Sequence, residues 1–387
     1  MKRIYLDNSA TTKVDERVAK LVYEYMTEKF GNASSAHFFG QEAKYALDNA
    51  REQIAKVINT GVNEIFFTSG GTEADNWAVK GIAGLYLDHG DPVHIITSAY
   101  EHSAVYDMCK FLTKLYPELM TVTYLKPDKN GTITPDSVIA AVNENTKLVS
   151  VMHVNNETGV INDIAAIGKF CRATGIVFHT DAVQSFTKVP IDVKAMNIDL
   201  LSASSHKIYG PKGVGMLYIR KKISLLPNQF GGHQENGMRT GTENLPGIVG
   251  FANAAEISFS EMKTEIPRIT GLRNKLYELI SAGVDDIIVN SDLKNGYGGI
   301  LNLTFNGVEG EALLLSLDLE GIAVSTGSAC STGEVKPSRV LTAIGRTAEE
   351  AQSSIRFSIG RFNTHEEIEF AAAKVIEAVK RLKEMMK

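Results

Sequence analysis

The sequence predicts an α/β fold in which a large domain with a mostly parallel sheet is followed by a smaller α+β domain. Apolar segments of strand length alternate with helical segments through most of the chain, which is typical of a parallel sheet covered on both faces. The chain has 387 residues, more than one small core accommodates. The strict alternation ends near residue 258. We therefore expect a large domain at 1–258 and a small one at 259–387, with the first 15 or so residues near the small domain.

The N-terminal segment is expected to start with a short extended stretch at residues 4–6 and a polar loop. Asp15 is then the predicted N-cap of a helix whose apolar residues share one face. A second amphipathic helix is expected from about residue 40 to residue 58.

From residue 65 onward, strands and helices alternate. The expected strands are 65–68, 93–97, 120–125, 148–154, 176–181, 200–204 and 214–219. Between them, helices are expected at about 70–87, 103–115, 136–142 and 164–174. Because no helix separates the last two strands, we expect the sheet to be mixed at that point.

In the C-terminal part, we expect helices and strands without the regular alternation of the first part. Helices are expected at 269–280, 309–319 and 364–386, and strands at 287–290, 300–305, 322–325 and 354–357. Thr364, followed three residues later by Glu367, predicts a capping box at the start of the last helix.

Composition excludes several classes of protein. Hydrophobic residues make up 44% and charged residues 22%, as in an ordinary soluble protein, and the net charge of -5 gives no reason to expect nucleic acid or a membrane as partner. No apolar run approaches the roughly 20 residues of a membrane span, and the N-terminus does not read as a signal peptide. Cys109, Cys171 and Cys330 are too widely spaced for a disulfide framework or a CxxC metal site, so we expect no metal and a reducing cytoplasm.

Four polar features follow predicted strands. Residues 69–72, Ser-Gly-Gly-Thr, join a strand to a helix N-terminus, where backbone N–H groups favour a phosphate. An ordinary turn capped by Thr72 explains them equally well, and they form neither a P-loop nor a GxGxxG motif. Asp181 ends a strand at the edge where parallel sheets bind ligands, although an aspartate also commonly begins a turn. His102 follows another strand, and a histidine of the core is the plain alternative.

Lys207 lies between the strand 200–204 and a loop rich in glycine and proline. A lysine at a sheet edge that faces a cleft can be desolvated, have its pKa lowered and act as a Schiff-base amine. On this stretch alone, a surface lysine after an edge strand is the better interpretation. Together, a phosphate cradle, a carboxylate, an imidazole and this lysine at one edge of a sheet suit a pyridine aldehyde phosphate.

At these positions the chain resembles the cysteine desulfurases of the NifS/IscS type, which are pyridoxal-phosphate enzymes of fold type I and class V of the aminotransferase superfamily. The resemblance extends over nearly the whole length. Its stretches are YLDNSATT at 5–12, TSGGTEADN at 68–76, HVNNETG at 153–159, DAVQ at 181–184, SSHKIYGPKG at 204–213, GMRTGT at 237–242, GSAC at 327–330 and IRFS at 355–358. Each stretch is weak alone, but eight in order are specific.

The resemblance implies a role for each residue around the ring of pyridoxal 5'-phosphate. Lys207 would hold the cofactor as a Schiff base, Asp181 would pair with the ring nitrogen, Gln184 would hydrogen-bond the phenolic oxygen, and His102 would stack on the ring. The residues implied for the phosphate are Gly71, Thr72, Ser204, His206 and, from the second subunit of a homodimer, Thr242. Asn156 would contact the cofactor and, with Arg356, receive the substrate carboxylate.

The resemblance also implies a second chemical centre at Cys330. Its segment is rich in serine, threonine and glycine, which predicts a mobile loop and a thiol able to travel. Lys207, once free, would remove the Cα proton of L-cysteine, and His102 would shuttle a proton to or from the substrate thiol. The Cys330 thiolate would then take the sulfur as a persulfide, leaving L-alanine, and pass it to an acceptor protein such as an iron–sulfur scaffold.

Two departures from the family pattern are visible. The cysteine segment reads Ser-Ala-Cys-Ser-Thr-Gly, where Ser-Ala-Cys-Thr-Ser is expected for this type. The chain ends at Lys387, soon after the last predicted helix, whereas longer relatives continue into a tail that helps to dock the scaffold. The expectation of scaffold docking is therefore weaker than that of catalysis.

Other functions remain open at this point. An aminotransferase of the same fold needs no nucleophilic cysteine, whereas a selenocysteine lyase could share it. A sulfur carrier or scaffold-binding protein without catalysis would be expected to lack Lys207 or Asp181, and both are present. A nicotinamide dehydrogenase would carry a glycine fingerprint that this chain lacks.

Overall fold

A seven-stranded sheet organises the first two thirds of the chain. The computed structural model describes residues 3–326 and 337–385. In spatial order the strands are β2 (Ile65–Thr68), β8 (Gly215–Ile219), β7 (Leu200–Ser204), β6 (Val177–Asp181), β5 (Thr146–Ser150), β3 (Val93–Ser98) and β4 (Met120–Leu125). The strands β7, β6, β5, β3 and β4 are parallel, and β8 is antiparallel to both of its neighbours. The expected mixed pairing is confirmed, one strand in from the edge.

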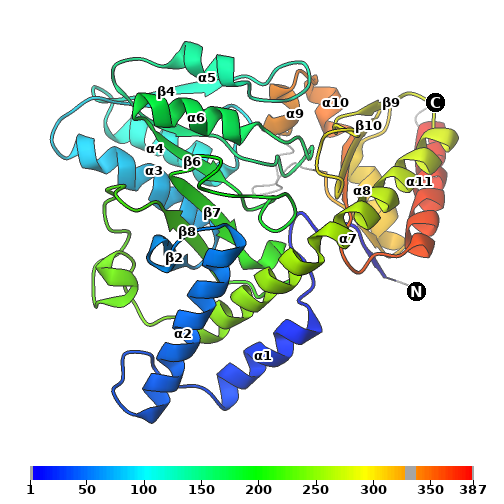
Figure 1. The fold of residues 1–387 in the computed structure, drawn as a ribbon. Helices are drawn as coiled ribbons and strands as arrows, with labels where there is room; N and C mark the ends of the chain where they lie inside the picture. The colour runs from blue at the N-terminus through cyan, green and yellow to red at the C-terminus, as the bar shows by residue number, and fades with distance from the viewer. Residues whose placement is uncertain (1–2, 327–336, 386–387) are drawn as a thin grey trace.

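Helices cover both faces of this sheet (Figure 1). They are α1 (Glu16–Thr27), α2 (Phe38–Val57), α3 (Gly71–Leu87), α4 (Ser103–Leu115), α5 (Pro135–Ala141), α6 (Ile164–Thr174) and the first half of α7 (Leu245–Gly283). Neighbouring residues of a strand enter different cores: Leu201 packs with α2, α6 and α7, and Leu200 packs with α3 and α4. This alternation follows from the two-residue period of a strand, and both faces are apolar because both are covered.

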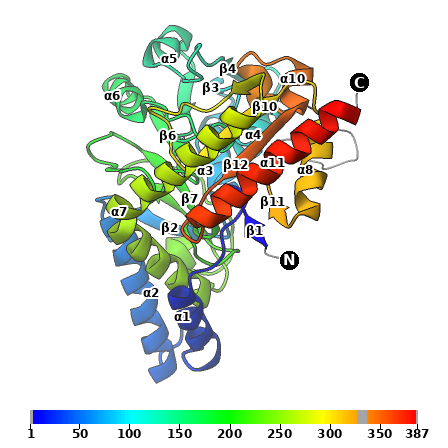
Figure 2. The ribbon, with the colours of Figure 1, turned by 90° about the vertical axis from the view of Figure 1, so that its right-hand side faces the viewer.

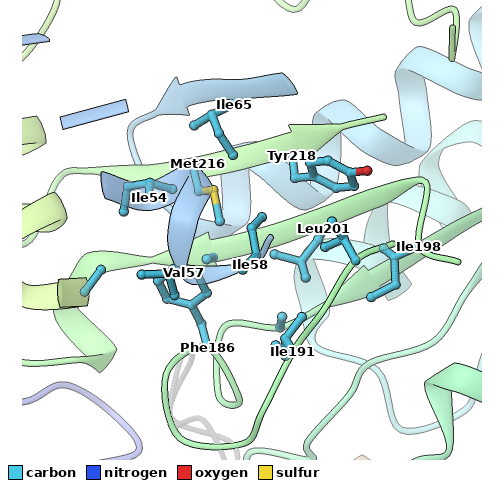
Figure 3. Close-up of a cluster of buried hydrophobic side chains, with 14 of the residues drawn as sticks. Ile54, Val57, Ile58, Ile65, Phe186, Ile191, Ile198, Leu201, Met216 and Tyr218 are labelled. Atoms are coloured by element: carbon cyan, nitrogen blue, oxygen red, sulfur yellow. The ribbon is translucent and has the colours of Figure 1, made fainter. Parts of the chain in front are cut away.

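Figure 3 shows part of the core on the α2 face. Ile54 and Ile58 at the end of α2 lie against Leu201 and Met216 of the sheet, and all four side chains are buried. Burying side chains of this size contributes about 1.5–3 kcal/mol each. This packing fixes the position of β7, the strand that leads into Lys207.

The smaller part contains a second sheet, with the order β12 (Ser354–Ser358), β10 (Ile300–Phe305) and β9 (Ile287–Val289). Its helices are α8 (Gly310–Leu319), α9 (Arg339–Ala343), α10 (Ala348–Gln352) and α11 (His365–Met385). The strand β1 (Ile4–Tyr5) pairs with β11 (Ile322–Ala323), so Ile4 and Leu6 enter this second core. The capping box of the last helix is confirmed, since the Glu367 N–H donates to Thr364 Oγ1 and the Thr364 N–H to Glu367 Oε2.

The helix α7 joins the two parts (Figures 1 and 2). Its first half packs on α1 and α2, and its second half packs on α11. The sequence analysis predicted a helix only at 269–280, whereas the structure has one continuous helix from Leu245 to Gly283. Pro246 lies in the first turn, after the N-cap Asn244, where a proline sacrifices no helical hydrogen bond. The expected division at residue 258 falls inside this helix, and it stays a prediction.

Three other differences from the expected elements are small. The strand expected at 148–154 ends at Ser150, and the strand expected at 322–325 ends at Ala323. The short helices α9 and α10 were not predicted, since five residues carry too little periodicity. No helix in the described part of the chain is long and apolar enough to cross a membrane.

Candidate active site

A cavity of about 340 Å³ opens where the parallel strands of the large sheet end. Segments far apart in sequence form its wall: the loops after β1, β5, β6 and β7, the start of α3 and the strand β12. Its lining residues are Ser9, Ala10, Gly71, Thr72, Asp75, His102, Met152, Asn156, Asp181, Val183, Gln184, Ser204, His206, Lys207 and Arg356. Of the predicted site residues that the structure describes, all except Thr242 lie here.

Lys207 ends a short 3₁₀ turn that follows β7 directly. Its Nζ donates to two backbone carbonyl oxygens of the N-terminal loop, those of Ser9 at 2.5 Å and Ala10 at 2.7 Å. Burial and the neighbouring charge of Arg356 lower the pKa of the Lys207 amine to about 8, against the opposing pull of nearby carboxylates. A substantial fraction of this amine is therefore neutral, and so nucleophilic, near pH 7.

Asp181 ends β6 and is buried beside the same cavity. Its Oδ1 accepts a hydrogen bond from the Val183 N–H at 2.8 Å. Burial raises the pKa of the Asp181 carboxyl, while the charges of His102 and Lys207 oppose this shift. A cationic N–H group in the cavity would stabilise its ionised form.

His102 is the N-cap of α4, and its Nδ1 accepts from the Ala104 N–H at 3.1 Å. A neutral ring with an accepting Nδ1 carries its proton on Nε2. The helix cap therefore fixes the tautomer of a histidine that lines the cavity.

Behind Asp181 lies a group of buried polar side chains that the sequence analysis did not select. Asp75 of α3 also lines the cavity, and its Oδ1 lies 3.6 Å from His179 Nε2 but has no hydrogen-bond partner among the described residues. Burial, with a contribution from Asp181, raises the pKa of the Asp75 carboxyl well above its ordinary value. Burial also lowers the pKa of His179 to about 3, so this ring is neutral. The pKa values of both carboxyls, Asp75 and Asp181, are thus raised by burial.

One end of the cavity is a cradle of hydrogen-bond donors. The helix α3 begins at Gly71 after the N-cap Gly70, so Thr72 lies in its first turn and is not the cap. The first N–H groups of a helix have no partner within it and carry the positive end of its dipole. Ser204 and His206 reach the same end of the cavity from β7 and the 3₁₀ turn. Burial, above all, lowers the pKa of His206 to about 4, so its ring donates as a neutral imidazole.

The opposite wall presents Arg356 from β12. Its Nη1 donates to the backbone oxygen of Asn156 at 3.0 Å, and its Nη2 donates to the Asp7 carboxylate at 2.8 Å. Its side chain is only 7% exposed, and its Nε has no partner within the described parts of the chain. A planar guanidinium group with an unused N–H donor is suited to bind a carboxylate ligand.

Thr242 lies away from this cavity. It lines two other hollows, both together with Gly241. The segment before it is fastened to the phosphate end of the site, because Arg239 Nε donates to Glu73 Oε1 at 2.9 Å. Within its own chain, Thr242 therefore contributes nothing to the cavity.

Cys330 and its expected mobile loop lie outside the described residues. The flanks of this segment are described, and both lie beside the cavity. Ser325 pairs through its backbone with Arg356, and Ser338 Oγ donates to Glu157 Oε2 at 2.5 Å. The other cysteines, Cys109 and Cys171, are buried, and burial raises the pKa of each thiol to about 12.

Sequence reasoning missed Ser9, Ala10 and Asp7, although all three lie in the quoted stretch 5–12. They contact Lys207 and Arg356 only through the folded chain, so no local pattern marks them. Among the described residues, no group of three or more His, Cys, Asp or Glu side chains could hold a metal ion.

The family model for class-V aminotransferases matches residues 4–370, and the chain belongs to that family. Cysteine desulfurases IscS of Salmonella schwarzengrund and of Escherichia coli are each 49% identical over 99% of this chain and 94% of the relative. Within the class-V family, the chain is therefore a member of the cysteine desulfurase group of the NifS/IscS type, as the resemblance predicted.

Solved structures agree with this placement. A NifS-like protein is 36% identical, with a TM-score of 0.91 over 98% of this chain and all of the other. A structure described as SspA in complex with cysteine is also 36% identical, with a TM-score of 0.82 over 94% of this chain and all of the other. A NifS-like protein from Rickettsia africae is 31% identical, with a TM-score of 0.86 over 99% and 100%.

Proposed function

We propose that this protein is a cysteine desulfurase that converts L-cysteine into L-alanine and an enzyme persulfide on Cys330. The observation that carries the proposal is the gathering of Lys207, Asp181 and Arg356 in one cavity. These residues supply an amine of lowered pKa, a buried carboxylate and a carboxylate-binding fork. The group of relatives to which the chain belongs supports the same reaction.

The residues of the cavity fit pyridoxal 5'-phosphate. The helix N-terminus and the Thr72, Ser204 and His206 side chains provide donors for a phosphate, and a Cβ added at Gly71 would lie 2.5 Å from Val183 Cγ2. A side chain at position 71 would therefore narrow this end of the cavity, where glycine leaves the backbone accessible. A cationic partner, such as a protonated ring nitrogen, would stabilise the ionised form of the buried Asp181 carboxyl.

In this arrangement Lys207 would hold the cofactor through Nζ, Asp181 would face the ring nitrogen, and Gln184 and His102 would contact the ring. Asn156 lines the same cavity and would contact both the cofactor and the substrate. When bound, the cofactor supplies an electron sink that makes the Cα proton of an amino acid acidic.

Arg356 would orient the substrate. Asp7 and the Asn156 carbonyl hold the guanidinium by two of its nitrogens, and Nε has no hydrogen-bond partner in the described part of the chain. A substrate carboxylate that binds this donor would place the amino group of cysteine toward Lys207.

Two side chains would handle protons. The Lys207 amine, with its pKa near 8, is suited to take the Cα proton and return one to the product. His102 keeps its proton on Nε2 through its helix cap and would exchange a proton with the substrate thiol.

Cys330 would act as the nucleophile toward sulfur. It follows Ser325 by five residues, so an extended chain lets it lie up to about 17 Å from that anchor, which is paired with Arg356. Its thiolate would attack the substrate Sγ, the S–S bond would form as the Cβ–Sγ bond breaks, and protonation of the remaining three-carbon fragment would give alanine.

We also propose that the protein acts as a homodimer in which Thr242 completes the phosphate site of the partner. Thr242 lies outside its own cavity, and large apolar side chains are exposed on α1, on α2, in the loop between them and in the loop after β8. The large apolar residues concerned are Tyr23, Met26, Phe30, Phe38, Phe39, Tyr45 and Phe230. A surface of this kind is typical of a protein interface. The sulfur acceptor, for which an iron–sulfur scaffold is our candidate, and a cytoplasmic location belong to the same proposal.

The test is the Cys330→Ala variant. We expect it to keep the yellow colour of the bound cofactor, because Cys330 is not needed to hold it, but to release no sulfide from L-cysteine under reducing conditions. Cys171→Ala, which changes a buried thiol on α6, is the matched control and should desulfurate normally. Normal sulfide release by Cys330→Ala would end the proposal for Cys330.

The alternatives separate in the same assay. An aminotransferase would convert a 2-oxo acid at the expense of an amino acid and would not depend on Cys330. A selenocysteine lyase would yield alanine much faster from selenocysteine than from cysteine.

A further inference from the structure

Lys188 is a half-buried lysine four residues after Gln184 that neither the sequence motifs nor the lining of the cavity select. Its Nζ donates to Gln184 Oε1 at 3.4 Å and lies 5.5 Å from the centre of the Tyr297 ring. Tyr297 itself is buried. A lysine in this setting is held by specific contacts and does not simply extend into solvent.

Two contacts, one with Lys188 and one with the Ser9 carbonyl, define which way the Gln184 amide faces. A glutamine amide has an accepting oxygen and a donating nitrogen, and its orientation follows from the hydrogen bonds around it. An ammonium can only donate, so Oε1 faces Lys188. The donor Nε2 is then left on the cavity side, where it donates to the Ser9 carbonyl oxygen at 2.8 Å.

The same Ser9 carbonyl also accepts from Lys207 Nζ. Lys188, Gln184, the Ser9 carbonyl and Lys207 therefore form one continuous set of hydrogen bonds. A change at Lys188 can reach Lys207 along these contacts although the two side chains lie on different segments.

Charged groups from several segments shift the pKa values of the Lys188 and Lys207 amines. Lys188 faces Lys207, which lowers its pKa, and Glu265, which raises it, and burial lowers the pKa of Lys188 to about 7. Lys207 faces Arg356, which lowers its pKa, and Asp7 and Asp181, which raise it. Lys188 is thus a second basic group in the immediate surroundings of Lys207.

We propose that Lys188 is a positioning residue that holds the Gln184 amide with its N–H side toward the bound cofactor. Gln184 can then donate to the phenolic oxygen of the ring. When Lys188 is protonated, its positive charge also disfavours a second charge on the Lys207 nitrogen. This inference rests on the proposed cofactor.

The experiment is a pH titration of the visible absorbance of the reconstituted protein, which reports the protonation of the Lys207 nitrogen. In Lys188→Met, the amide loses its fixed orientation and the neighbouring charge is removed. Both changes make the Lys207 nitrogen more basic, so its apparent pKa should rise by about one unit, the size of one lost hydrogen bond to a charged group. Lys188→Arg keeps the donor and the charge and should titrate like the wild type. Lys194→Met, an exposed lysine on the same loop, is the control for loss of a charge.

A double-mutant cycle with Gln184→Ala tests the route. If Lys188 acts through Gln184, Lys188→Met should add much less to the apparent pKa in the Gln184→Ala background than in the wild type. Fully additive shifts would overturn the inference, and so would a Lys188→Met protein that melts earlier but titrates unchanged. A wild-type protein that shows no cofactor band after reconstitution would instead refute the proposed cofactor, and this inference with it.

Discussion

Replacing Arg356 with methionine should raise the pKa of the Lys207 amine. The structure holds Lys207 at a pKa of about 8, chiefly through burial and next through the charge of Arg356, while Asp7 and Asp181 act in the opposite direction. At pH 7.5 an amine of pKa 8 is about one quarter neutral, whereas an ordinary lysine of pKa 10.5 is about one part in a thousand neutral. The cavity thus increases the reactive fraction of Lys207 by a factor on the order of 200.

In Arg356→Met the like charge is lost, and Asp7 loses its ion-pair partner and acts more strongly on Lys207. We expect the pKa of Lys207 to rise by about one unit, which lowers the neutral fraction at pH 7.5 by roughly eightfold. The assay is the rate at which the protein freed of cofactor captures added pyridoxal 5'-phosphate, followed by absorbance from pH 6 to 10. The midpoint of this profile should move upward.

Arg17→Met is the matched control, because Arg17 is half-exposed and pairs with Asp15 and Glu261 far from the cavity. Its capture profile should coincide with that of the wild type. An unchanged midpoint in Arg356→Met would refute the view that Arg356 tunes Lys207. A wild-type midpoint near 10.5 would refute the lowered pKa altogether.

Three further predictions concern the cavity and its surroundings, beginning with Glu101, the buried neighbour of His102. Burial raises the pKa of the Glu101 carboxyl to about 8, so this carboxyl is protonated in the folded protein below that pH. The free energy of unfolding therefore falls as pH rises from about 4.5 through 8. Glu101→Gln, which imitates the protonated form, should therefore melt higher than the wild type at pH 8, and the difference should vanish near pH 4.5; equal melting at pH 8 would contradict this. Gly71→Ala should weaken cofactor binding by roughly tenfold, because its Cβ would crowd Val183, and Val183→Ala should restore binding if that contact is the cause. Mixed dimers of Thr242→Ala and Lys207→Ala subunits should recover up to about a quarter of the activity, since one intact site forms per heterodimer; no recovery after confirmed subunit exchange would argue against a shared site.

Much of the site was predictable because it depends on local order. Asp181 ends a strand, Lys207 follows one, and the glycines at 70–71 begin a helix. Carboxyl ends of parallel strands meet at one edge of a sheet, so these residues had to lie together once the alternation of strands and helices was recognised. The roles of Gln184, His102 and Arg356 were expected only from the family resemblance, and Cys330 rests on that resemblance still.

The tertiary structure decided what the side chains of the site contact. Asp7 meets Arg356 across almost the whole chain, and the carbonyl groups of Ser9 and Ala10 hold Lys207. Neither contact leaves a local pattern, since each joins segments that only the fold brings together. The pKa values likewise follow from burial, which a sequence does not state for a polar residue.

The sequence by itself predicted the fold class and placed Asp181 and Lys207 at the edge of the sheet where the parallel strands end. These depend on the two-residue period of strands, on turn-forming residues and on motifs read in order. Only the folded chain showed that the N-terminal loop lines the cavity, that one helix from Leu245 to Gly283 joins the two cores, and that Lys188 contacts Gln184. These features depend on contacts between distant segments, and their energies come from burial and close packing.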